Sequence, residues 1–222
     1  MRYLAVAAAV ARKDLVCELR GRELVPALAQ FVILSLLVAN FGFDFEQSGA
    51  ARLAPGVLWL AVVFAALLAF GRTFAAEREQ ASLEAVLLTG ASPAAVFSGK
   101  AAAAVVTLAG CECVLLAGLA LFFGTPLLSA GLLAALLLAT IGMAALGCLF
   151  AALAVQTRGR ELLLPVLALP LWIPIVVGGG HAVQVAMGSA AGSLIPALGL
   201  LLDIDILFVV AASLAARFVL DD

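Results

Sequence analysis

The sequence predicts an all-α integral membrane protein, with six transmembrane helices behind an N-terminal amphipathic surface helix. Hydrophobic residues make up 66% of the 222 residues and charged residues only 12%, whereas soluble domains average about 45–50% apolar and about 25% charged residues. The mean hydropathy is +1.24, and six apolar runs approach the roughly 20 residues that a spanning helix needs. The net charge of −2 and the lack of a basic run give no indication of nucleic-acid binding. A lipid bilayer is therefore the expected environment.

Residues 1–23 are predicted to form an amphipathic helix on the membrane surface. Basic residues interrupt this stretch, as is typical of a helix whose polar face lies among lipid head groups. Apolar side chains recur at helical spacing, at Leu4, Ala8, Ala11, Leu15 and Leu19. A plain basic tail is the alternative. The apolar start is short and runs into charged residues rather than a cleavage site, so we expect this segment in the mature chain.

Six apolar spans are predicted to form a single transmembrane domain over residues 1–222. They cover about residues 24–43, 53–71, 101–123, 128–155, 162–177 and 198–218. Three glycines, Gly178–Gly180, are poor helix formers, so we expect the fifth span to end before them. Residues 178–196 are then expected to lie outside the membrane and to form one or two short helices at its surface.

The basic residues predict the orientation of the spans, because cytoplasmic loops carry an excess of lysine and arginine. With the N-terminus in the cytoplasm, eleven of the twelve Lys and Arg residues lie on the cytoplasmic side. They are Arg2, Arg12, Lys13, Arg20, Arg22, Arg72, Arg78, Lys100, Arg158, Arg160 and Arg217. Only Arg52 falls on the opposite side. We therefore expect both termini in the cytoplasm.

One polar interruption, residues 72–100, separates the second and third spans and is predicted to be cytoplasmic. We expect it to hold a short amphipathic helix, closed by Gly90, and a second helix that starts at Ser92 and Pro93. Serine is a favoured N-cap, and proline in the first turn lacks only an N–H that would have no helical partner. A short helix in such a loop is typical of a site that receives a cytoplasmic partner.

The first helix of this loop is expected to dock its partner through an apolar face. Leu83, Val86 and Leu87 lie at positions i, i+3 and i+4 and therefore share one side of the helix. Charged residues are predicted to form a polar rim around them, namely Glu77, Arg78, Glu79 and Glu84. The alternative is that the apolar trio packs back on the bundle and the charges make the contact.

No nucleotide-binding motif is present in the sequence, so we expect the chain not to be an enzyme. The string nearest to a Walker A motif, Ser98-Gly99-Lys100-Ala101, lacks the hydroxyl residue that should follow the lysine. The chain has one histidine and four cysteines. Cys111 and Cys113 are two positions apart and lie on opposite sides of a helix, so they cannot face one metal ion together. The cysteines are expected to be small apolar fillers.

Acidic residues at membrane depth are costly and often functional. Glu112, about halfway along the third span, is either a contact in a translocation path or a hydrogen-bonded packing residue. Asp203 and Asp205, in the sixth span, are predicted to lie on opposite faces. At most one of them can therefore face a shared cavity, and the alternative is that they extend to the outer interface.

Two stretches resemble a known family. The first comprises RLAPGVLW, which opens the second span, and SLEAVLLTGASPAAVFSGK in the loop after it. The second is GRELLLPVLALPLWIPIVVGG, a basic turn followed by a proline-spaced span. Together with the chain length and the six-span layout, they resemble the CcmB family, the haem exporter permease subunits of the ABC-type complex in cytochrome c maturation. The sixth span departs from the family's pattern, because Asp203 and Asp205 interrupt it.

The resemblance implies an ABC-2 type permease in the inner membrane of a bacterium. The helix in the 72–100 loop would then be a coupling helix that docks on a separate ATPase subunit, CcmA. Two permease copies would pair with two ATPase copies, beside the membrane subunits CcmC and CcmD and the haem chaperone CcmE. The expected function is to couple ATP hydrolysis by the partner to haem export or delivery for c-type cytochrome biogenesis.

The resemblance leaves the handling of haem open. It implies that CcmC and CcmE hold haem, and no cofactor is assigned to this chain. His181, the only histidine, is expected just outside the membrane, either as an axial ligand to haem iron or as a solvated loop residue. Two alternative functions stay open: a permease for another substrate, such as a lipid-linked glycan or drug, and a non-transporting relay that releases the haem-loaded chaperone.

Overall fold

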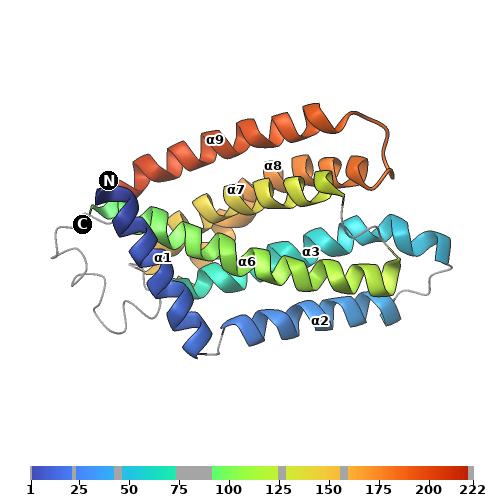
Figure 1. The fold of residues 1–222 in the computed structure, drawn as a ribbon, viewed down its shortest axis with the longest axis horizontal. Coiled ribbons are helices and arrows are strands. Elements are labelled where there is room, and N and C mark those ends of the chain that lie inside the picture. The colour runs from blue at the N-terminus through green and yellow to red at the C-terminus, as the bar shows by residue number, and fades with distance from the viewer. Residues whose placement is uncertain are drawn as a thin grey trace.

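The computed structural model describes residues 2–21, 24–42, 47–73, 92–124, 129–155 and 160–219, and the regular elements within these ranges are helices. They are α1 (Arg2–Gly21), α2 (Leu24–Gly42), α3 (Gln47–Thr73), α6 (Pro93–Phe123), α7 (Ala130–Val155), α8 (Arg160–Ala186) and α9 (Leu194–Val219). In Figure 1, α2 to α9 run side by side as a bundle, and α1 crosses one end of it at a steep angle. This arrangement confirms the predicted all-α fold.

Six of these helices are long and apolar enough to cross a membrane. The qualifying stretches are Leu24–Gly42, Leu53–Thr73, Pro93–Phe123, Ala130–Ala154, Leu162–Ala186 and Leu194–Ala216. An even number of crossings returns the chain to the side on which it started. The start of α2, the end of α3, the start of α6 and the end of α9 therefore lie at the end of the bundle that α1 crosses (Figure 1).

α7 is the central helix of the bundle. Of its most apolar stretch, 72% is buried inside the protein, against 17% for α9, and it packs against α8, α9, α6 and α3. Small residues permit this close packing, as in other membrane helix bundles. A Cβ atom on Gly147 would overlap the ring of Phe70 from α3, and one on Gly142 would overlap the carboxylate of Asp205 from α9. Large side chains of the neighbouring helices thus fill notches in α7.

The predicted helix start at Ser92 and Pro93 is confirmed, but this helix continues into the third span without a break. Ser92 adopts an extended backbone, its Oγ accepts a hydrogen bond from Ala95 N at 3.3 Å, and Pro93 occupies the first turn. The third span was expected to begin at residue 101. Its 31-residue helix is about 46 Å long at 1.5 Å per residue, which exceeds the roughly 30 Å hydrocarbon core of a bilayer. This helix is therefore longer than a perpendicular crossing of the bilayer requires.

The structure also differs from the prediction at the end of the fifth span, because α8 continues through the three glycines to Ala186. A Cβ atom on Gly179 would lie 2.5 Å from the indole ring of Trp59 in α3. Glycine weakens an isolated helix because it has no side chain. Here the missing side chain leaves the space in which Trp59 packs against α8. Residues 178–186 are therefore part of the spanning helix, and only residues 187–193 form a turn between α8 and α9.

Candidate functional site

The candidate site is the junction of α1, α3 and α6 at one end of the bundle. α3 ends at Thr73 and α6 begins at Pro93, so these two ends flank residues 74–91. The residues predicted to dock a partner are Glu77, Arg78, Glu79, Leu83, Glu84, Val86 and Leu87, and they lie outside the described residues. Their arrangement as a docking face stays a prediction, whereas the helices that carry this segment can be described in detail.

α1 crosses α6 in close contact at Gly99. A Cβ atom on Gly99 would lie 2.6 Å from the carbonyl oxygen of Ala7 and 2.8 Å from Cβ of Val10. Real Cβ atoms essentially never approach backbone so closely, and Val10 is buried in the same contact. The glycine therefore lets the backbones of the two helices come together.

Tyr3 holds the first turn of α1 on α6. Its hydroxyl group donates a hydrogen bond to the carbonyl oxygen of Ala94 at 3.0 Å, and it lies 2.6 Å from Oγ of Ser98. Both partners belong to the turns of α6 that precede Gly99. α1 is thus attached to the beginning of α6, the helix that follows residues 74–91 in the sequence.

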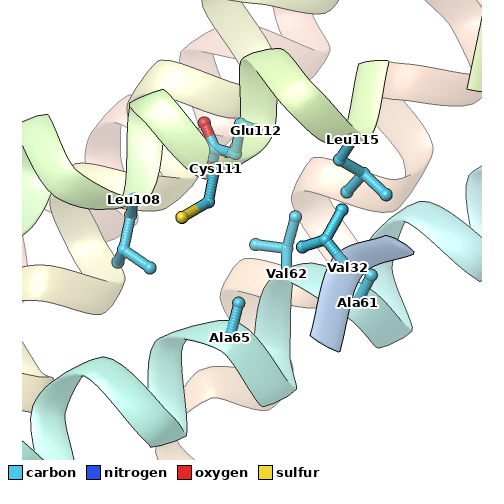
Figure 2. A pocket seen from close by; sticks show the side chains of 8 residues that line it. All are labelled: Val32, Ala61, Val62, Ala65, Leu108, Cys111, Glu112 and Leu115. Carbon is cyan, nitrogen blue, oxygen red and sulfur yellow. The ribbon is translucent and has the colours of Figure 1, made fainter. Parts of the chain in front are cut away.

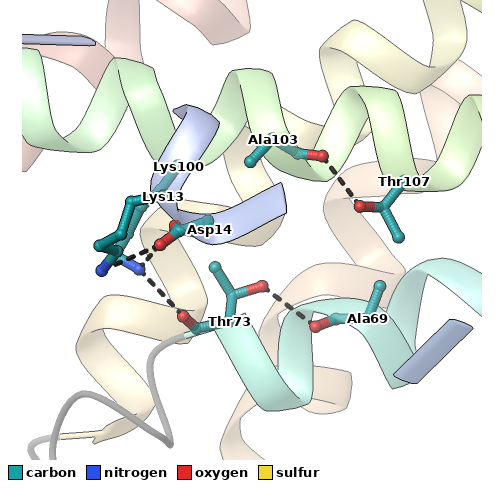
Figure 3. A network of polar contacts seen from close by, with 7 residues as sticks. All are labelled: Lys13, Asp14, Ala69, Thr73, Lys100, Ala103 and Thr107. Atoms are coloured by element: carbon teal, nitrogen blue, oxygen red, sulfur yellow. Dashed lines mark hydrogen bonds and ion pairs between the residues drawn. The ribbon is translucent and has the colours of Figure 1, made fainter. Parts of the chain in front are cut away.

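Lys100 connects three helices at this junction. Its side chain is only 2% exposed, and its Nζ atom donates to Asp14 Oδ2 of α1 at 3.1 Å and to the carbonyl oxygen of Thr73 at 3.2 Å (Figure 3). Thr73 is the last residue of α3, where carbonyl groups lack helical partners and a cation is favourable. Lys13 also lies 3.0 Å from Asp14 Oδ1. Lys100 and Asp14 therefore link α6 to both α1 and α3.

This role of Lys100 was not predicted from the sequence. The sequence indicated only that Lys100 is one of the basic residues on the predicted cytoplasmic side and that it belongs to an incomplete nucleotide-binding motif. The available signal was a single lysine within the apolar run AVFSGKAAAAVV. An unpaired lysine is almost never fully buried, so that position predicts a nearby acceptor. Identifying the acceptors required the fold, since Asp14 is 86 positions away and Thr73 is 27 positions away.

Glu18 sets the connection from α1 to α2. Its Oε1 atom accepts hydrogen bonds from the backbone N–H groups of Leu24 at 2.9 Å and Val25 at 3.0 Å. These N–H groups belong to the first turn of α2, where no helical acceptor exists, and the negative charge is favourable there. The next residue, Pro26, has no N–H to satisfy. One carboxylate therefore caps the start of α2 from the end of α1.

Glu112 is buried where α6 meets α7, and its Oε1 atom accepts a hydrogen bond from the Thr140 hydroxyl. Glu112 also belongs to the wall of a small hollow between α2, α3 and α6, which has room for about one water molecule. Figure 2 shows Cys111 pointing into this hollow, whereas the carboxylate of Glu112 points away from it. The geometry matches the packing alternative, and a role for Glu112 in a translocation path stays a prediction.

Asp203 and Asp205 lie on opposite faces of α9, as predicted. Asp203 is exposed, but Asp205 is only 3% exposed and does not reach the outer interface. The notch at Gly142 receives its carboxylate. Among the described residues neither carboxylate oxygen has a hydrogen-bond partner. The prediction that Asp205 extends to the interface is therefore wrong, because this side chain packs between α9 and α7. Residue spacing alone does not show which helix lies against Asp205.

His181 lies on α8, directly after the three glycines, and its side chain is exposed. It was expected in a loop outside the membrane, and the continuation of α8 accounts for the difference. A contact between His181 and haem stays a prediction. Within the described ranges, no three His, Cys, Asp or Glu side chains gather closely enough to hold a metal ion.

Comparisons with known proteins agree along the length of the chain. The family model described as "CcmB protein" matches residues 5–221. "Heme exporter protein B" of Paracoccus denitrificans is 34% identical over 200 residues, which cover 86% of each chain. The protein of the same name from Rhodobacter capsulatus is 35% identical over 71% of this chain and 72% of its own. That from Bradyrhizobium diazoefficiens is 33% identical over 79% of this chain and 80% of its own.

Proposed function

Because this chain belongs to the CcmB protein family, we propose that it is the membrane permease subunit of an ABC-type complex that exports or delivers haem for c-type cytochrome biogenesis. The observation that carries this proposal is the family match over residues 5–221. Relatives of nearly the same length, named as heme exporter proteins, support haem as the transported or handled ligand.

The proposed energy source is ATP hydrolysis by a separate, CcmA-like subunit. The sequence has no Walker A motif, and the polar 74–91 segment connects two long helices that can act as levers. Nucleotide binding would close the ATPase dimer and displace this segment, together with the end of α3 and the start of α6. Such a change is a population shift between two conformations, driven by a partner.

We place the junction of α1, α3 and α6 on the cytoplasmic side of a bacterial inner membrane. The supporting observation is the distribution of basic residues, which is strongly one-sided. A second copy of this chain, CcmC- and CcmD-like membrane subunits and a CcmE-like haem chaperone complete the proposed assembly. Lipid surrounds the remaining apolar faces, such as that of α9.

The docking face is tested by replacing Val86 and Leu87 with Asp and measuring how much ATPase subunit co-purifies from membranes. We expect loss of the ATPase and of c-type cytochromes, because two charges would disrupt an apolar contact. The control replaces Ala81 and Ala85 with Asp, on the predicted opposite side of the same helix. Normal co-purification and normal cytochrome assembly with the Val86 and Leu87 variant would refute the assignment.

Haem movement itself is tested with sealed vesicles that contain the purified complex. ATP-dependent accumulation of haem across the vesicle membrane is the expected result for an exporter. ATP-dependent release of haem-loaded chaperone without haem accumulation would instead support the relay function. ATP-dependent transport of a lipid-linked glycan or a drug, with neither haem accumulation nor chaperone release, would contradict both functions.

A further inference from the structure

We propose that Lys100 and Asp14 form the joint that passes movement of the 74–91 segment to α1, so that Lys100 is a positioning residue for coupling. The proposal rests on the proposed function, because it takes the 74–91 segment as the entry point for ATP-driven motion. It goes beyond that function by assigning the transmission of motion to one ion pair, between the buried Lys100 and the partly buried Asp14. The ion pair lies among described residues, outside the predicted docking face.

The positions of the two acceptors make Lys100 sensitive to movement on both sides of the segment. Thr73 is the last residue of α3, directly before residues 74–91, and its carbonyl oxygen is 3.2 Å from Nζ. Lys100 itself lies on α6 seven residues after Pro93, so about two helical turns separate it from the other end of the segment. A displacement of either helix end changes the position of the ammonium group relative to its acceptors.

The ion pair then requires α1 to follow the ammonium group. Lys100 is 2% exposed, so water cannot take the place of a lost acceptor. Separating a buried ammonium group from its carboxylate weakens the compensation of its charge, which is unfavourable. Asp14, 3.1 Å away on α1, is therefore held to Lys100 while α6 moves. An apolar contact would slide more readily, because dispersion forces have no fixed direction.

Neighbouring contacts convert this attachment into movement of the whole of α1. Gly99, next to Lys100, brings α6 against the backbone of Ala7, while Tyr3 holds the preceding turns through Ala94 and Ser98. At the far end of α1, Glu18 caps the start of α2. Movement of α1 is thereby passed on to a spanning helix that is not adjacent to the 74–91 segment in sequence.

The test uses the complete complex in lipid nanodiscs, with a fluorescent label on Cys17, which is exposed on α1. Cys111, Cys113 and Cys148 are replaced by Ala so that only Cys17 reacts. The measurement is the change in emission when a non-hydrolysable ATP analogue is added. We expect a change in the parent complex, its loss in Lys100→Met and Asp14→Asn, and its retention in Lys100→Arg, which keeps the charge.

Two controls separate the joint from general loss of stability. Arg12→Gln alters an exposed basic residue of α1 near Asp14 and should keep the emission change. Gly179→Ala creates an overlap with the rigid ring of Trp59, toward the distant end of α8, and should lower the thermal midpoint while keeping the emission change. ATPase co-purification is measured for every variant, and Lys100→Met should retain it.

Each outcome decides the proposal. An undiminished emission change in Lys100→Met, or no change in the parent complex with its ATPase bound, would overturn the joint and leave the proposed function standing. Equal loss in Gly179→Ala would also overturn it, because the effect would then follow stability alone. Failure of any ATPase to co-purify with the parent chain would overturn the proposed function, and the joint with it.

Discussion

Asp205 of α9 lies against Gly142 of α7 so closely that a Cβ atom on Gly142 would overlap its carboxylate oxygen. The side chain of Asp205 is buried, and its oxygens have no hydrogen-bond partner among the described residues. An acidic residue thus occupies the packing notch that joins the least buried spanning helix to the central one. This contact leads to the first prediction.

Gly142→Ala is expected to destabilise the protein, because the added methyl group would push α9 away from α7. Overpacking of this kind typically costs about 1–3 kcal/mol. The thermal unfolding midpoint in nanodiscs measures the effect. The double variant with Asp205→Ala should recover most of the loss, since it removes the atoms that the methyl group meets.

Gly110→Ala is the matched control on α6, because a Cβ atom there meets nothing within 4 Å. This change should be neutral or stabilising, since alanine is favoured over glycine in a helix by roughly 0.5–1 kcal/mol. Equal destabilisation by Gly110→Ala and Gly142→Ala would contradict the notch.

Within the glycine run of α8, Gly179→Ala should be harmful and Gly180→Ala tolerated. A Cβ atom on Gly179 would lie 2.5 Å from the Trp59 ring, whereas one on Gly180 would lie 3.6 Å from Nε1 of the same ring. A rigid, buried indole cannot move aside easily, so we expect a loss of about 1–3 kcal/mol for Gly179→Ala alone. Thermal midpoints of the two variants provide the comparison, and similar values would refute this packing.

Thr140→Val should destabilise the contact between α6 and α7, because it leaves the buried carboxylate of Glu112 without its hydroxyl donor. An unsatisfied buried polar group costs about 1–3 kcal/mol. Glu112→Gln should fold normally and support c-type cytochrome formation, since an amide keeps the shape and can also hydrogen-bond. A stable Glu112→Gln protein that forms no c-type cytochromes would instead place Glu112 in a translocation path.

Glu18→Ala is expected to loosen the start of α2, because two backbone N–H groups lose their acceptor. Loss of a helix cap costs about 0.5–2 kcal/mol. Amide hydrogen exchange at Leu24 and Val25 should accelerate, and Glu18→Gln, which keeps an acceptor oxygen, should retain most of the protection. Unchanged exchange in Glu18→Ala would show that another group caps this turn.

Local features of the sequence predicted most of the fold. Apolar length and composition decide whether a segment spans a membrane, and they correctly predicted six spanning helices. The start of α6 was predicted from Ser92 and Pro93, since a capping interaction involves neighbours within one turn. The CcmB family was identified from motifs in the sequence and confirmed by the match over residues 5–221.

The tertiary structure alone decided the features that depend on distant partners. Spacing placed Asp203 and Asp205 on opposite faces, but only the notch at Gly142 determined which one is buried. The glycines at 178–180 predicted the end of a helix. In the folded protein, Trp59 of α3, far away in sequence, packs against them and makes glycine favourable there.

Lys100 shows the same division between sequence and structure. Its charge contributed to the predicted orientation of the chain through composition, which requires no knowledge of neighbours. Its contacts with Asp14 and Thr73 exist only because three helices converge at one end of the bundle. The sequence by itself therefore determined the membrane fold and the family, because these follow from local apolarity and motifs. The tertiary structure decided the buried polar contacts, because each of them requires partners that the chain brings together only on folding.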